Sequence, residues 1–216
     1  MKEDRIDYYI PRFKLKLEWV ITALVLPVLV SACFLLLRGS FEKNAIDLNQ
    51  KLVIVSAGVF FTGFGAGIVE EIIFRGIIMN VVEKRFDRKV AIIVPSLLFG
   101  ILHIIGMDFN LLSCALVILA GTMVGIMFSL IALKTKSVWN SAIVHALWNI
   151  IIIGGILNIG TSFNENSLYS YVLDTKSFVW TGGEFGIESS IIGVAGYVLV
   201  CLVAILLDKK IYRKNL

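Results

Sequence analysis

The chain has 216 residues, of which 58% are hydrophobic and only 17% are charged. Soluble domains carry about 25% charged residues, so this composition excludes an ordinary soluble domain. The net charge of +4 comes from basic residues that stand beside long apolar runs. That placement is typical of membrane topology and does not indicate a nucleic-acid partner.

Apolar runs long enough to span a bilayer follow one another along the chain. In chain order they cover residues 19–37, 52–82, 90–107, 111–133, 137 to about 160, and 189–207. We therefore expect an all-α, polytopic bundle of about six transmembrane helices in the cell membrane. It would comprise a cytoplasmic N-terminal segment (1–18), a single membrane-embedded domain (19–207) and a basic cytoplasmic tail (208–216).

The basic residues predict the orientation of this bundle. If the six runs all span the membrane, one side carries fifteen of the Lys and Arg residues and the other side carries four. The four are Arg38, Lys43, Lys51 and Lys176. Because Lys and Arg are retained in cytoplasmic connections, both termini are predicted to be cytoplasmic.

The second run and the connection 161–188 each have an unusual length. The second run has 31 residues and would measure about 46 Å as a straight helix, against a hydrocarbon core of about 30 Å. The glycines at 63, 65 and 67 could kink it, and Gly121 and Gly125 fit close helix packing. The long connection 161–188 is interpreted as a solvated loop on the outer side, with gating of a site below it as the alternative.

Ionisable residues inside the apolar runs are the most informative feature. Glu70, Glu71 and Arg75 interrupt the second run, and the chain's two histidines, His103 and His145, lie in the third and fifth. A charge in hydrocarbon costs roughly 3 kcal/mol, so such residues usually mark a functional or a paired structural role.

The depths of these residues agree. Counted from the cytoplasmic end of each run, Glu70 and Asn149 lie about 18 Å deep, His103 about 20 Å and His145 about 12 Å. Three helices therefore bring polar groups to one level near the middle of the bilayer.

Local spacing separates the two glutamates. Glu71 and Arg75 stand four residues apart with the acid first, the favourable order for an ion pair. Glu70 is turned by about 100° from Glu71, so one carboxylate can face a cleft while arginine holds the other. His145 and Asn149 share one helix face, as do Phe99 and His103.

A carboxylate and a histidine that meet in a dry pocket can activate a water molecule. A second histidine and an asparagine amide are suitable hydrogen-bond donors for an oxyanion. Together these groups predict hydrolysis of a peptide bond by an activated water.

Three motifs resemble one known family. Glu70-Glu71-Ile72-Ile73-Phe74-Arg75, Phe99 to His103, and His145 to Asn149 are similar to the EExxxR, FxxxH and HxxxN motifs of the CAAX-protease and bacteriocin-processing (CPBP, Abi) family. The resemblance covers about residues 52–160, the expected peptidase core.

The resemblance implies a membrane-embedded endopeptidase that acts on a membrane-associated peptide or protein. Glu70 and His103 would activate water, and His145 and Asn149 would form the oxyanion hole. Glu71, Arg75 and Phe99 would support the site. Whether the substrate is prenylated, and whether the role is maturation of a peptide or immunity to a bacteriocin, stays open.

The same residues are compatible with three different functions, of which a peptidase is the first. No cofactor is expected for the peptidase, but a zinc-dependent form of it would use Glu70, His103 and His145 as ligands. The absence of an HExxH helix and the donor character of His145 and Asn149 favour the metal-free form. A non-catalytic binding or immunity protein and a proton-coupled transporter are the second and third possibilities.

Overall fold

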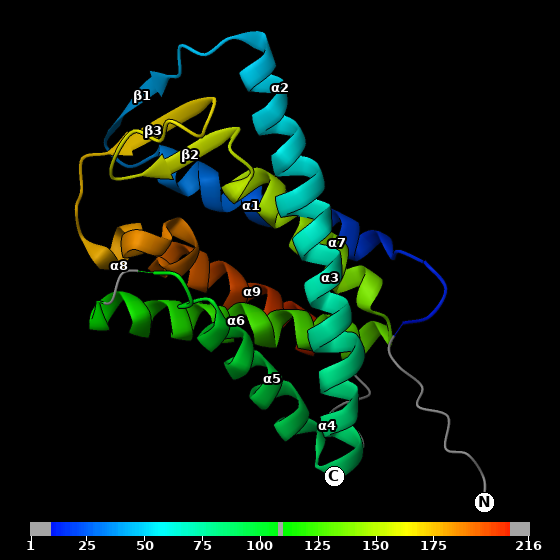
Figure 1. Cartoon of the computed structure of the whole chain (residues 1–216). Helices are drawn as coiled ribbons and strands as arrows, with labels where there is room; N and C mark the ends of the chain where they lie inside the picture. Colours follow the sequence, from blue (N-terminus) through cyan, green and yellow to red (C-terminus); the bar gives the residue numbers. More distant parts are fainter. Residues whose placement is uncertain (1–9, 108–109, 208–216) are drawn as a thin grey trace, which may run out of the picture.

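A computed structural model describes residues 10–107 and 110–207. The predicted basic tail (208–216) and the first nine residues of the predicted N-terminal segment therefore lie outside the described residues. Helices dominate the described chain (Figure 1). In chain order they are α1 Leu17–Leu35, α2 Leu48–Ser56, η1 Ala57–Ala66, α3 Gly67–Glu71, η2 Ile72–Ile78, α4 Met79–Arg85, α5 Arg88–Leu102, α6 Leu111–Thr135, α7 Val138–Trp148, η3 Asn149–Ile153, α8 Phe178–Thr181, η4 Gly183–Phe185, η5 Ile187–Ser189 and α9 Ile191–Leu207.

Three of these helical segments are long and apolar enough to cross a membrane: Leu17–Leu35, Leu48–Arg85 and Leu111–Thr135. Val138–Ile153 and Ile191–Leu206 are apolar but shorter. These helices support a membrane protein, as the composition predicts. The count of six spans and the orientation of the termini stay predictions.

A small sheet is the main departure from the all-α prediction. Strand β3 (Tyr169–Leu173) lies in the middle, antiparallel to β1 (Gly39–Lys43) and parallel to β2 (Leu157–Gly160). The interpretation of residues 161–188 as a solvated loop is therefore wrong, because this segment contains a strand and three short helices, α8, η4 and η5. Short strands give too few residues for a clear alternation of polar and apolar side chains.

Two predicted spans are also shorter than expected. The third helix ends at Leu102, and the fifth ends at Ile153 before β2 begins. Gly155, directly after the cap of η3, has a φ angle of 78°. This left-handed conformation ends helices, and an apolar run by itself does not reveal it. The third helix ends at the right-handed cap His103, and Gly106, with a φ angle of 88°, follows in the turn beyond it.

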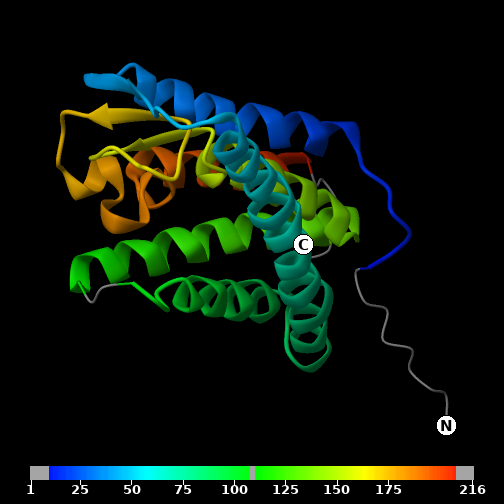
Figure 2. The ribbon, with the colours of Figure 1, turned by 45° about the horizontal axis from the view of Figure 1, so that its top comes forward.

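The helix from Leu48 to Arg85 is continuous and crosses the other long helices steeply (Figures 1 and 2). It contains two π-helical stretches, η1 and η2, which flank the single α-helical turn α3 that carries Glu70 and Glu71. The length of this run predicts a distortion of the helix. In the structure the distortion consists of wide π turns. Such turns are frequent at functional sites.

Glycines let the helices around the site approach backbone to backbone. A Cβ on Gly67 of α3 would lie 2.8 Å from the backbone nitrogen of Ala146 in α7. A Cβ on Gly121 of α6 would lie 2.7 Å from the Cα of Gly100 in α5. The close packing predicted for Gly121 and Gly125 is therefore confirmed, and Gly67 brings the two glutamates beside His145.

The apolar core lies between α1, α6, α7 and α9. Trp19, Phe34, Phe128, Trp148 and Tyr197 are each at most 2% exposed. Large apolar side chains on other faces are exposed, for example Leu24 on α1, Phe61 on η1 and Leu119 on α6. Apolar side chains in such numbers on outer faces are expected where lipid, and not water, surrounds the helices.

The predicted orientation can be tested with two exposed positions at opposite ends of the bundle. In a variant without Cys33, Cys114 and Cys201, Ser162→Cys should react with a membrane-impermeant maleimide in intact cells. Lys84→Cys, at the end of α4, should react only after permeabilisation. Labelling of position 84 from outside intact cells would contradict the orientation.

Candidate active site

A buried ion pair lies beneath the site. Glu71 and Arg75 are both fully buried, and Nη1 of Arg75 donates to Oε1 of Glu71 at 2.8 Å. Nη2 of Arg75 donates to the backbone oxygen of Gly125 in α6 at 3.0 Å. The predicted ion pair is thus present, and it ties the long helix to α6.

Aromatic rings complete the surroundings of this arginine. Its guanidinium carbon lies 4.7 Å from the ring centre of Phe99 and 5.2 Å from that of Phe128. Aromatic faces attract a desolvated cation. Phe99, predicted to support the site, therefore contacts Arg75 as well as the histidines.

His145 lies between the two glutamates. Its Nδ1 is 3.2 Å from Oε1 of Glu71, and its Nε2 is 3.8 Å from Oε2 of Glu70. The ring stacks on Phe128 with 4.6 Å between centres. The Nε2 distance is too long for a hydrogen bond, so the Glu70 carboxylate, with its side chain 34% exposed, can still bind a molecule in the cavity.

His103 follows the last turn of α5 and points into the same cavity. Its Nδ1 lies 2.7 Å from the backbone oxygen of Phe99. A carbonyl oxygen only accepts, so Nδ1 carries the hydrogen and Nε2 of the neutral ring is an acceptor. His103 therefore has the tautomer that a proton-accepting histidine needs.

Asn149 is positioned by the long helix. Its Nδ2 donates to the backbone oxygen of Thr62 in η1 at 2.9 Å, and its side chain is buried. The bond uses one of the two amide hydrogens. The same side chain lines the cavity, where the second hydrogen can serve a bound group.

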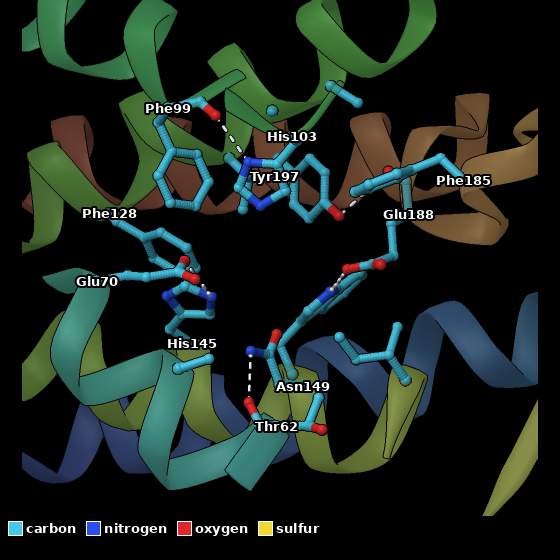
Figure 3. Close-up of a pocket in the computed structure, with 16 residues that line it drawn as sticks. Thr62, Glu70, Phe99, His103, Phe128, His145, Asn149, Phe185, Glu188 and Tyr197 are labelled. Atoms are coloured by element: carbon cyan, nitrogen blue, oxygen red, sulfur yellow. Dashed lines mark hydrogen bonds and ion pairs between the residues drawn. The ribbon is translucent and has the colours of Figure 1, made fainter. Parts of the chain in front are cut away.

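One cavity of about 140 Å³ collects these side chains (Figure 3). Glu70, His103, His145 and Asn149 all line it, with Phe99 beside them, while Glu71 and Arg75 lie behind its wall. The structure thus brings together the four residues that the motifs predict to be catalytic. The pairing differs in one respect, since the histidine within ion-pair distance of Glu70 is His145, whereas the hypothesis grouped Glu70 with His103.

A second carboxyl group that lines the cavity, that of Glu188, was not predicted. Glu188 of η5 accepts a hydrogen bond from Nε1 of Trp148 at 2.6 Å, and its backbone oxygen accepts one from the hydroxyl of Tyr197 at 3.2 Å. Burial raises the pKa of the Glu188 carboxyl, and the bond from Trp148 opposes this rise. The only signal in the sequence was the position of Glu188 just before the last apolar run.

No sequence pattern marked the other residues that line the cavity as site residues, although Trp148 lies inside the third motif and Gly121 was predicted to pack closely. They are Thr62, Ala66, Ala120, Gly121, Val124, Phe128, Trp148, Ile153, Phe185 and Tyr197.

The residues that a zinc site would use do not form a metal-binding cluster here. Within residues 10–107 and 110–207, no three His, Cys, Asp or Glu side chains are grouped closely enough to hold a metal ion. His145 directs both ring nitrogens toward glutamates. The absence of a cofactor stays a prediction.

Comparison with known proteins supports the resemblance seen in the motifs. Residues 51–151 match the sequence model of the family described as type II CAAX prenyl endopeptidase Rce1-like. This segment, a little under half of the chain, contains all seven predicted site residues, so the match supports the resemblance that the motifs carry. No curated protein and no solved structure was found to be similar to the chain.

The buried ion pair yields a stability prediction. Arg75→Ala leaves the Glu71 carboxylate in a dry environment without its arginine partner, and breaking a buried pair costs about 3–5 kcal/mol. The variant should accumulate less in the membrane and unfold at a lower temperature, as measured by thermal denaturation in detergent.

Arg88→Ala is the matched control, because Arg88 pairs with Glu83 at the surface and exposed pairs contribute little. Equal stability of the Arg75→Ala and wild-type proteins would contradict a structural role for the buried pair.

Proposed function

We propose that this chain, which carries the Rce1-like family core, is an intramembrane endopeptidase. It would hydrolyse a peptide bond of a membrane-associated peptide or protein with an activated water. The observation that carries the proposal is the convergence of Glu70, His103, His145 and Asn149 on one cavity between apolar helices. Its setting would be the cell membrane, which the chain crosses several times.

Glu70 and His103 would activate the water. The Glu70 carboxylate faces the cavity without a hydrogen bond to the described protein residues, and Nε2 of His103 is a proton acceptor. Water between them would give a proton to one of these groups as its oxygen attacks the scissile carbonyl. The same proton would then pass to the leaving amine.

His145 and Asn149 would stabilise the oxyanion. With a proton on each ring nitrogen, His145 donates to Glu71 through Nδ1 and has a second N–H for the cavity. Asn149 has one amide hydrogen left after its bond to Thr62. Two donors in a water-poor cavity stabilise negative charge more strongly than they do in water.

Glu71 and Arg75 would act through His145. Oε1 of Glu71 accepts from both Arg75 and His145, which fixes the orientation of the imidazole ring. Neither side chain lines the cavity, so we assign both a positioning role.

The assignment of the base can be tested in cells. A proteomic comparison of cells with and without the protein should reveal a membrane or secreted peptide that stays unprocessed without it. Wild-type protein should restore processing, whereas Glu70→Gln and His103→Ala should lower it by about 10²–10⁴-fold at normal membrane levels. Full processing by Glu70→Gln would refute the role given to Glu70. Absence of any processing difference would favour a binding or immunity protein.

The oxyanion hole and the zinc-dependent mechanism predict different results for two variants. In the metal-free mechanism, His145→Ala and Asn149→Ala should each lower turnover by about 10²–10³-fold with KM nearly unchanged. A strong chelator should then have no effect on purified enzyme. Stoichiometric zinc that is lost in His145→Ala and retained in Asn149→Ala would overturn the metal-free mechanism.

A further inference from the structure

Two further cavities share walls with the catalytic cavity. One, of about 260 Å³, shares Ile153, Phe185 and Glu188 with it and is lined by three asparagines, Asn158, Asn164 and Asn166. The other, of about 360 Å³, shares Glu70, Phe99 and His103 with it and is otherwise apolar, with Phe74, Leu102 and Ile105. The catalytic cavity thus lies between a polar chamber and an apolar one.

Glu188 stands at the boundary with the polar chamber. Its carboxylate is fixed by the bond from Trp148, and its backbone is fixed by Tyr197. In Figure 3 it lies across the cavity from Glu70 and His145. A polar group held in place at a junction is suited to recognise a substrate group that passes it.

The surroundings of Glu188 favour a cation. Among the described residues, neither lysine nor arginine lines the catalytic cavity or the polar chamber, and Glu188 has no ion pair with either type. Burial raises the pKa of the Glu188 carboxyl, while Trp148 and His145 oppose this rise only in part. An entering cation would offset the remaining cost of burying the charge. Phe185, Trp148 and Tyr197, which also line the cavity, add aromatic surface that binds cations.

We propose that Glu188 is a specificity residue that binds a lysine or arginine side chain of the substrate on the polar-chamber side of the scissile bond. This inference rests on the proposed function. The inference assigns Glu188 no part in the bond-breaking step, and Glu188 is distinct from the residues that would activate water.

Binding can be measured without catalysis. Glu70→Gln protein in phosphatidylcholine nanodiscs would be titrated by calorimetry with N-octanoyl-lysine amide and with N-octanoyl-norleucine amide, which lacks the ammonium group. The lysine probe should bind at least about 10-fold more tightly. Adding Glu188→Gln, which keeps an acceptor for Trp148, should abolish this difference. Adding Glu165→Gln, a change at an exposed acid of the 161–188 segment, should preserve it.

Charge reversal provides a second arm. Glu188→Lys should bind N-octanoyl-glutamate amide in preference to the lysine probe, provided that its thermal unfolding matches that of the parent. Equal binding of the lysine and norleucine probes by the parent protein would overturn the inference and leave the proposed peptidase untouched.

Cleavage of a mixed library of N-acylated peptides distinguishes a failure of the specificity role of Glu188 from a failure of the proposed peptidase function. Wild-type protein should select a basic residue at a fixed distance from the cut, and Glu188→Gln should lose that selection while it still cuts. A uniform loss of cleavage in Glu188→Gln would overturn the specificity role. Lack of any cleavage by wild-type protein would count against the peptidase, while the binding result would still decide the role of Glu188.

Discussion

The site depends on one constraint: a guanidinium that stays charged must be accommodated among apolar helices. Arg75 satisfies this constraint through Glu71, the backbone oxygen of Gly125 and the faces of Phe99 and Phe128. These partners lie on three different helices, the long helix, α5 and α6. Holding the charge therefore also fixes how these helices pack against one another, and the walls of the cavity follow from that packing.

The same ion pair gives two adjacent carboxylates different surroundings. Glu71 is engaged by Arg75 and His145, whereas Glu70 remains turned toward the cavity. Gly67, one turn earlier, allows α3 to touch the backbone of α7 and so brings both acids within reach of the histidine. The segment that matches the Rce1-like family thus places a fully buried acid next to an accessible one, a difference in burial and neighbours between chemically identical side chains.

Much of the candidate site could be predicted because it depends on local rules. Spacing along a helix fixes which face a residue occupies, and length fixes its depth, so the meeting of Glu70, His103, His145 and Asn149 followed from the sequence. The proximity of Glu70 to His145 did not, because it depends on the crossing of helices and on the π turns beside α3. The sheet and Glu188 were missed because short strands and a single acid carry little pattern. Membrane character was predicted well, whereas the number of spans stays a prediction.

The small sheet couples two connections that are far apart in the sequence. β1 follows α1, while β2 and β3 follow α7, and further bonds from Asn44 to Glu165 and from Tyr171 to Leu37 join the same two segments. Chain that is cross-linked in this way opens as one cooperative unit and not strand by strand. Residues 169–173, which precede the segment with Glu188, therefore cannot separate from β1 without breaking this sheet. Leu102 and Ile105, on the apolar side of the cavity, lie outside the sheet and carry no such constraint.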